Sequence, residues 1–218
     1  MDYQAREITI LKNDEFRMLL AAAGIDEWYG IDLDEAGQSL GDERSFNEIL
    51  AALYQKHIIS WGEEKAHIDD RYRPLMRVLK DASVCVTAVT VFRPGYIRGS
   101  YFSRGNAVVI ERRTASSDEL EISMLPFSEW ADELEAEGYC PQTLSPEEDD
   151  DTADSGEELI SEFELRSLPG GVLKQTIRLY ECGLYGMIEM DDGSGKIREP
   201  FSRDMLTELL KEWTGGNE

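Results

Sequence analysis

The sequence predicts an α+β protein in which antiparallel strands pair at the centre and helices group at the ends. The first observation is a change in hydrophobic period at Ser83, from about 3.6 residues before it to 2 after it. The second is that the strand candidates that follow are joined by short connections, which favours antiparallel neighbours over βαβ units. With hydrophobic residues at 41%, the chain can bury a sizeable core, and we expect one domain over residues 1–218.

The first elements are a short strand and a helix. Residues 7–11 have the β-branched composition of a strand. Apolar residues at i, i+3, i+4 and i+7 then predict a helix that begins near Glu15, has Asn13 or Asp14 as its N-cap and ends at Gly24. Residues 25–42 are rich in Gly and Asp and are expected to form a loop.

Two further helices complete the N-terminal part. Ser45 is the predicted cap of the second helix, and Pro74 fits the first turn of the third. The predicted buried face of the second helix is Phe46, Ile49, Leu50, Leu53, His57 and Ile58, and that of the third is Tyr72, Leu75, Met76, Leu79 and Ala82. His57 is therefore expected to be a packed core histidine.

Four strands and a fourth helix are expected next. The strands are 84–92, 97–102, 107–113 and 119–124, and turns that carry Gly, Pro, Asn or Ser join them. A meander is the simplest arrangement of such strands. The helix that follows opens at Ser128 and ends at Gly138.

The C-terminal part begins with a segment that has no hydrophobic periodicity. Residues 141–157 include the run 147–151 of five carboxylates, and we expect a mobile acidic surface loop there. Two strands, 172–180 and 185–190, lead through the Asp192-Gly193 turn to Lys196 and Ile197. A last helix, capped by Ser202, ends at Gly215-Gly216. Both halves thus show strands, turns and a closing helix, without a fixed-period repeat.

The charge of the chain excludes several classes of partner. Forty-five Asp and Glu against 22 Lys and Arg give a net charge of −23, and residues 114–165 contain many carboxylates but neither Lys nor Arg. Such a balance repels phosphate backbones and anionic lipid surfaces, so we expect neither nucleic acid nor membrane as a partner. A membrane span needs about 18 apolar residues in a row, which this sequence lacks, and it shows no targeting segment. A cytoplasmic location is expected.

The sequence contains no constellation that predicts catalysis. Cys85, Cys140 and Cys182 match neither a disulfide framework nor a CxxC metal pair, and they are expected to be reduced thiols. His67, Asp69 and Asp70 are too few for a convincing metal site, and the run 149–151 lacks the spacing of a calcium loop. We therefore expect no enzyme activity, no cofactor and no metal.

One segment opposes the overall charge. Residues 93–113 contain Arg93, Arg98, Arg104, Arg112 and Arg113 against a single carboxylate, Glu111. These arginines can neutralise the acidic segment that follows within the same chain. Alternatively, the 93–97 loop with its Arg and Tyr is an exposed contact for a protein partner, since both residue types are enriched at interfaces.

Several stretches resemble the EspG-type chaperones of type VII (ESX) secretion systems. The N-terminal stretches are "ITILKNDEFRMLLAAAG", "FNEILAALYQKHIISW" and "RPLMRVLKDASVCVTAVTVF". The central hairpins are similar in "YIRGSYFSRGNAVVIERRTASSDELEISMLP", and the terminal strand pair and helix in "YGMIEMDDGSGKIREPFSRDMLTELLKEW". The resemblance covers most of the chain except about residues 139–165, where the acidic insertion departs from the family pattern.

This resemblance implies a fold and a function. The fold is an EspG-like central antiparallel β-sheet flanked by helical bundles, with approximate internal twofold symmetry. The function is that of a non-catalytic cytosolic chaperone or adaptor that binds a helical secreted protein (PE/PPE-, WXG- or LXG-like) before export, as a monomer or weak homodimer. In the family, the helical tip of the substrate docks against the loop after the second strand and the C-terminal helical bundle. The partner-binding residues that follow here are Arg93, Pro94, Gly95, Tyr96, Ile97 and Arg98, with the exposed side of the last helix.

Two other functions stay open at this stage. An acidic α+β protein without catalytic residues also suits an immunity protein that neutralises a basic toxin. The stretch "FNEILAALYQKHIISW" with the next helix can alternatively be read as part of a winged-helix regulator, although the net charge argues against DNA binding.

Overall fold

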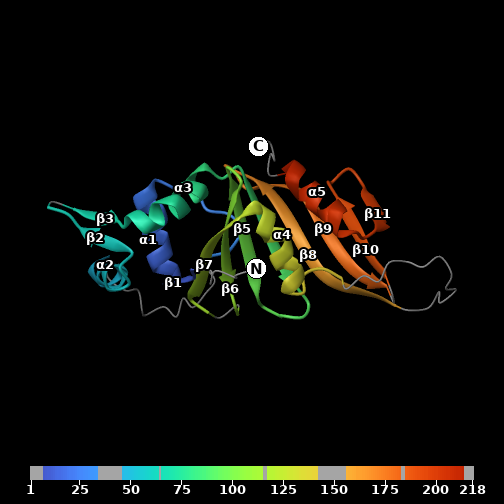
Figure 1. The fold of residues 1–218 in the computed structure, drawn as a ribbon, viewed down its shortest axis with the longest axis horizontal. Helices are drawn as coiled ribbons and strands as arrows, with labels where there is room; N and C mark the ends of the chain where they lie inside the picture. Colours follow the sequence, from blue (N-terminus) through green and yellow to red (C-terminus); the bar gives the residue numbers. More distant parts are fainter. Residues whose placement is uncertain are drawn as a thin grey trace.

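A nine-stranded antiparallel sheet forms the centre of the protein (Figure 1), which confirms the α+β class. The computed structural model describes residues 7–33, 46–63, 65–114, 117–141, 156–182 and 185–213. The sheet has the order β1-β7-β6-β5-β4-β8-β9-β10-β11. Its strands are β1 (Thr9–Lys12), β4 (Val84–Thr90), β5 (Ile97–Ser103), β6 (Asn106–Arg112), β7 (Glu119–Pro126), β8 (Glu157–Ser167), β9 (Val172–Cys182), β10 (Tyr185–Asp191) and β11 (Lys196–Pro200).

The order of elements repeats within the sheet. A four-strand meander, β4 to β7, is followed by the helix α4 (Phe127–Ala136), and a second meander, β8 to β11, is followed by α5 (Arg203–Trp213). The first strands of the two meanders, β4 and β8, lie side by side and antiparallel at the middle of the sheet. The order of elements is therefore repeated. That a twofold axis relates the two meanders in space stays a prediction.

Helices cover the two faces of the sheet unequally. One face is covered by α1 (Asn13–Ala23), α2 (Phe46–Gln55) and α3 (Arg73–Asp81), and the other by α4 and α5. Alternation along β4 supplies both cores, since Cys85 packs with the first group of helices and Val86 with the second. Figure 1 shows α1 to α3 gathered at the β1 and β7 end of the molecule. The resemblance predicted helical bundles beside the sheet, and the structure has three helices on one face of the sheet and two on the other.

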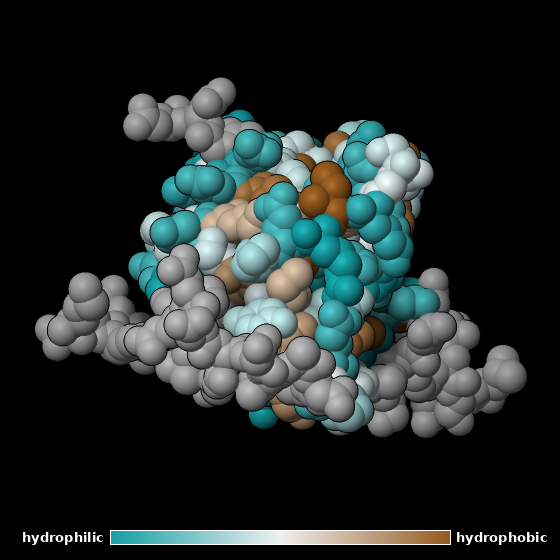
Figure 2. Space-filling view, turned by 90° about the vertical axis from the view of Figure 1, so that its right-hand side faces the viewer, coloured by the Kyte–Doolittle hydropathy of each residue, from teal (hydrophilic) through white to brown (hydrophobic). Residues whose placement is uncertain are grey.

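The helices α1 to α3 cover one face of the sheet over the first meander. Over the second meander, the same face of the sheet is charged. Arg178 of β9 places Nε 2.6 Å from Glu162 of β8, and its NH1 lies 3.3 Å from Glu189 of β10. Arg198 of β11 adds a contact of 3.6 Å to Glu189 and lies 5.1 Å from the ring centre of Tyr180. These in-register charges compensate one another across four strands, so that this face remains stable beside water. Figure 2, which views the β10, β11 and α5 end, shows mainly hydrophilic residues with small apolar groups between them.

The long strand β8 is absent from the sequence prediction. Its Phe163 and Leu165 face the α4 and α5 core, whereas Glu162 and Glu164 lie on the charged face. A bulge between Leu159 and Ser161 interrupts the alternation at the start of the strand, whereas residues 162–166 alternate regularly, a signal that the sequence prediction did not use. Of the acidic loop expected over 141–157, residues 142–155 lie outside the described residues, and Glu157 already belongs to β8.

The second predicted helix is shorter than expected. It ends at Gln55, and His57 has a left-handed backbone with φ of 57° and an exposed side chain, so its prediction as a core histidine is wrong. A hairpin of β2 (Ile59–Trp61) and β3 (Ala66–Ile68), also missed, follows before the 3₁₀ turn Asp70–Tyr72. Ile58 is buried as predicted.

The helix ends follow the predicted chemistry in part. The Ser202 hydroxyl accepts a hydrogen bond from the Met205 amide at 3.2 Å, which confirms it as the cap of α5. The first helix begins at Asn13 with Lys12 as its N-cap, and the buried Glu15 accepts the Lys12 amide at 2.9 Å. The predictions for Ser45, residues 34–42 and Gly215-Gly216 lie outside the described residues. Of the helices described, none has the length and apolar character of a membrane span.

Candidate functional site

The connection between β4 and β5 presents an apolar and basic tip. Val91 and Phe92 follow the end of β4 at Thr90 and have exposed side chains, Phe92 at 60%, and the exposed Arg93, Pro94 and Gly95 come next. The Tyr96 amide donates to the Arg93 carbonyl at 3.0 Å and closes the turn. Gly95 has φ of +78°, a left-handed conformation in which a side chain would be strained. The sequence therefore locates the turn correctly, because Pro-Gly sets its backbone.

Tyr96 supports this tip from below and does not lie on its surface. The side chain is buried, and the Arg93 guanidinium lies 5.2 Å from the centre of its ring. Burial raises the pKa of the Tyr96 phenol well above its ordinary value, and nearby Glu111 raises it further. The phenol thus stays neutral and holds Arg93 in place. The expectation that Tyr96 is part of an exposed contact is therefore wrong. The next residue, Ile97, is half-buried.

Arg98 is fully buried, so it cannot contact a partner directly. Its NH1 atom lies 3.0 Å from Glu111 of β6 and 2.9 Å from Glu137, just beyond α4, and its NH2 atom contacts Glu133 of α4. Three carboxylates offset the cost of burying this guanidinium. The cluster joins β5, β6 and α4, and the NH1 atom of Arg93 reaches it with a contact of 3.7 Å to Glu137.

A cavity of about 590 Å³ lies beneath the tip. Arg93, Pro94 and Tyr96 form one wall. The rest of the lining is mainly polar and includes Glu111, Glu121, Glu133, Glu137, Arg113 and Ser123, together with Ile8. The arrangement offers charged hydrogen-bonding groups beside exposed apolar side chains, which suits a protein surface more than a small apolar ligand.

The arginine-rich segment neutralises the acidic segment within the chain. Arg113 contacts Glu121 at 2.7 Å, and Arg93 and Arg98 contact Glu133 or Glu137, all three carboxylates lying within residues 114–165. This confirms the intramolecular interpretation for these three arginines. Arg104 instead contacts Asp81 of α3 at 2.9 Å, and Arg112 donates to Asn13 and to the Asp32 carbonyl. Arg104 and Arg113 keep exposed side chains in these contacts, and the exposed tip formed by Val91 to Gly95 lies at the start of the segment.

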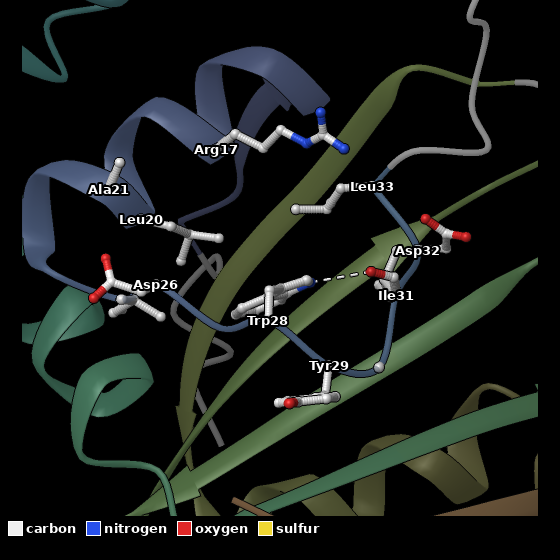
Figure 3. Close-up of a pocket in the computed structure, with 11 residues that line it drawn as sticks. Arg17, Leu20, Ala21, Asp26, Trp28, Tyr29, Ile31, Asp32 and Leu33 are labelled. Carbon is white, nitrogen blue, oxygen red and sulfur yellow. Dashed lines mark hydrogen bonds between the residues drawn. The ribbon is translucent and has the colours of Figure 1, made fainter. Parts of the chain in front are cut away.

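A second cavity, of about 540 Å³, lies between α1 and residues 25–33 (Figure 3). Trp28 lines this cavity. Its indole N–H donates to the Ile31 carbonyl at 3.0 Å, and its ring stacks on Tyr101 with ring centres 4.4 Å apart. Contacts within the chain therefore fix the position of the Trp28 side chain. Figure 3 shows Arg17, Asp26 and Asp32 spread around the cavity and not converging on one point. This geometry assembles no catalytic group.

The residues considered for metal binding or nucleophilic chemistry lie in other surroundings. The Asp69 carboxylate contacts Arg71 at 3.0 Å, and among the described residues no three His, Cys, Asp or Glu side chains gather as a metal site. Burial raises the pKa of Cys85 and of Cys140 to about 12, so neither thiol is activated as a nucleophile.

Phe92 is the residue that sequence reasoning missed. It was assigned to the strand 84–92, but β4 ends at Thr90 and leaves Val91 and Phe92 in the turn. The available signal is the turn sequence Arg93-Pro94-Gly95, which follows Phe92 directly and limits how far the strand can extend.

Comparison with known proteins gives a match of fold. No protein-family model and no curated protein sequence matches the chain. Among solved structures, the chain is similar to the type VII secretion system chaperone EspG5 of Mycobacterium tuberculosis, in a complex with the PE25-PPE41 dimer. The identity is 9%, the TM-score is 0.55, and the match covers 95% of each chain. At this identity the likeness establishes a shared fold, which agrees with the family resemblance found in the sequence.

Proposed function

We propose that this protein is a non-catalytic cytoplasmic chaperone or adaptor that binds helical substrates of a type VII secretion system before export. The observation that carries the proposal is the fold match, which extends over almost the whole of both chains and involves a chaperone solved with a PE-PPE dimer. The substrate is a helical secreted protein of the PE/PPE, WXG or LXG kind, and no cofactor takes part.

The β4–β5 tip is the proposed contact for that substrate. Phe92 offers an apolar anchor, and Arg93 offers a charge that is held over Tyr96 and beside Glu137. A central aromatic residue with an adjacent arginine is the composition of an energetic hot spot. In this proposal Arg93, Pro94 and Gly95 contact the substrate, while Tyr96, Ile97 and Arg98 position them. The exposed side of α5 completes the surface.

Co-expression tests the proposal. Each small helical secretion substrate of the host is co-expressed with the tagged protein, and the complex is isolated by affinity and size-exclusion chromatography. We expect one substrate to co-purify stoichiometrically. The proposal fails if the protein elutes alone with every substrate.

A matched pair of variants then tests the surface. Phe92→Asp removes the proposed anchor and should weaken substrate binding at least tenfold in calorimetry, because hot-spot truncations cost about 2 kcal/mol or more. Val172→Asp alters a residue of similar exposure, 55%, on β9 and should leave affinity unchanged. Equal affinities for Phe92→Asp and wild type would place the contact elsewhere while leaving the chaperone function intact.

An immunity protein is the second candidate, favoured by the acidic surface of α4. The helix carries four carboxylates and no Lys or Arg, although Arg98 contacts Glu133 and Arg203 contacts both Asp132 and Glu135. Such a surface would steer a basic toxin toward it. Rescue of cells that express a basic toxin encoded nearby, without any secretion substrate bound, would support this function over the chaperone.

A further inference from the structure

The two edge strands of the large sheet differ in how their outward backbone groups are satisfied. The sheet ends at β1 on one side and at β11 on the other. The Asn13 amide bonds to a carbonyl just before β7, so the alternate residues Ile10 and Lys12 point their backbone groups away from the sheet. Lys56 donates to the Ile10 carbonyl at 3.1 Å, and the Lys12 amide donates to Glu15 at 2.9 Å. Side chains therefore protect the edge at β1 against a further strand.

The edge at β11 is open. The Phe201 amide donates to a carbonyl of β10 at 2.8 Å, which sets the alternation along the strand. Ile197 and Glu199 then bond to β10, whereas Lys196 and Arg198 direct their N–H and C=O groups away from the sheet. Within the part of the chain that the structure describes, nothing bonds to these outward groups of Lys196 and Arg198. All residues of β11 are exposed, and Figure 2 looks onto this end of the molecule.

A row of alternating charges leads across the sheet to this edge. Glu162, Arg178, Glu189 and Arg198 come from β8 to β11 and lie side by side in register. The row ends on Arg198, which also contacts Glu157 at 2.9 Å and keeps 38% of its side chain exposed. Opposite charges on neighbouring strands are favourable. The position beyond Arg198 would therefore continue the alternation with a carboxylate.

The neighbouring residues of β11 define two more positions. Lys196 lies on the same face as Arg198, with 56% of its side chain exposed. Ile197 lies between them on the opposite face, beside Met190, and is 56% exposed. Ile177, Met190 and Ile197 form an apolar row in register, of which the first two members are in the core with α5. An added strand would thus meet a basic, an apolar and a basic side chain in succession.

We propose that β11 accepts an extended segment of another protein as a further antiparallel strand. The segment carries a carboxylate opposite Arg198, an apolar side chain opposite Ile197 and a carboxylate opposite Lys196. Backbone hydrogen bonds to the outward groups supply affinity in this mode of recognition, and the alternating side chains supply specificity. The site is separate from the β4–β5 tip, and it does not depend on the proposed chaperone function.

The charges favour this segment over other occupants of the edge. Two copies of β11, paired through both outward residues, would bring Arg198 opposite Lys196 or Arg198 of the other copy, and like charges directly opposite are destabilising. The acidic run 147–151 of the chain itself has no apolar residue between its carboxylates. The net charge of −23 repels a strongly acidic partner, so the segment carries its carboxylates at these two positions. Pro200 has no amide N–H, and the segment is therefore short.

A synthetic peptide tests the backbone pairing. The probe is a capped, fluorescent peptide with glutamate, valine and glutamate between threonines, and fluorescence anisotropy measures its binding to the complete wild-type protein. We expect saturable binding. N-methylation of the two glutamate amides, which face β11, should abolish binding, whereas methylation of the valine amide, which faces away, should leave it within a factor of about two. A peptide with lysine in place of both glutamates should bind at least tenfold more weakly.

Protein variants test the charges. Arg198→Glu should weaken binding of the glutamate peptide about tenfold, because an opposite-charge pair becomes a like-charge pair. The double variant Lys196→Glu, Arg198→Glu should bind the lysine peptide better than the glutamate peptide. Lys174→Glu makes the same charge change on β9, away from the edge, and should have no effect. Circular dichroism checks that each variant is folded, and the methylation series uses the unaltered protein.

Several results would overturn the proposal: no binding of the glutamate peptide, equal losses from the two methylation patterns, or an unchanged preference in the double variant. A wild-type dimer that the peptide dissociates would assign the edge to a second copy and would also overturn it. The chaperone proposal is tested separately, because a substrate that co-purifies equally with wild type and with Arg198→Glu supports that function whatever binds to β11.

Discussion

The NH1 atom of Arg98 lies 2.9 Å from a carboxylate oxygen of Glu137, and this contact ties the end of α4 to the middle of the sheet. Because Arg98 is completely buried, the contact is a structural support that lies directly under the candidate partner surface.

Arg98→Ala should destabilise the protein strongly. The substitution leaves three carboxylates without their buried counter-charge, and such losses cost about 3–5 kcal/mol. Urea unfolding followed by circular dichroism measures the effect. Arg104→Ala is the control, since Arg104 contacts Asp81 at the surface and should contribute less than about 1 kcal/mol. Equal losses for the two variants would contradict the assigned role of Arg98.

Gly171→Ala should lower the free energy of unfolding by more than the backbone strain of an alanine at a positive φ. A methyl group at Gly171 would lie 2.0 Å from the ring of Tyr29, and its φ of +60° is left-handed. Gly105→Ala, with φ of +74° and nothing within 4 Å, carries only the strain of about 1–2 kcal/mol. The difference in unfolding free energy between the two variants measures the Tyr29 contact. It should shrink when Tyr29→Ala is combined with Gly171→Ala, and a difference that persists would refute the contact.

Glu189→Gln should lower stability at pH 7 but not in acid. Hydrogen bonds from Lys196 and then Arg178 hold the pKa of Glu189 below its ordinary value in the folded state. A carboxylate whose pKa is lower in the folded state than in the unfolded state stabilises the protein fully at pH values above its unfolded-state pKa. This stabilisation is lost as the pH falls through its folded-state pKa. The stability difference between wild type and variant should therefore disappear at low pH. Urea unfolding of wild type and variant, measured from pH 7 into acid, checks this, and a difference that persists at low pH would contradict the assigned role of Glu189.

The thiols should be almost inert in the folded protein. Burial raises the pKa of Cys85 and Cys140 to about 12, so at pH 8 only about one thiol in ten thousand is a thiolate. Cys182 is also buried, and its pKa is raised for the same reason. A disulfide reagent should react with three thiols in denaturant and with none rapidly in buffer. Rapid labelling of Cys85 in buffer would show that its surroundings open easily.

Local signals in the sequence predict most of the first meander. The turn residues between β4 and β5 and between β5 and β6, and the continuous apolar run 107–110 of β6, depend on neighbours within a few positions. The pairing of β8 depends on residues distant in the sequence, because Glu162 on its charged face lies opposite Arg178 of β9. A single sequence cannot show that pairing.

The candidate site divides in the same way. Arg93-Pro94-Gly95 is recognisable as an exposed turn because its residue types set the backbone. The burial of Arg98 is not recognisable, because Glu133 lies on α4 and Glu137 directly after it, and the position of this helix over β5 depends on the whole fold. A charged residue is normally exposed, and only tertiary structure overturns that expectation.

The pairing of β4 with β8 also affects how the chain folds during synthesis. Thr90 pairs with Ser161 and Val84 with Ser167, so a ribosome releases β4 well before its neighbour exists. Until then β4 has an open edge, and such edges recruit other strands. A fragment that stops at Pro141 would keep the edge open permanently and should aggregate, whereas the complete chain closes it by a slow, non-local step. This protein thus passes through an aggregation-prone stage of its own during synthesis.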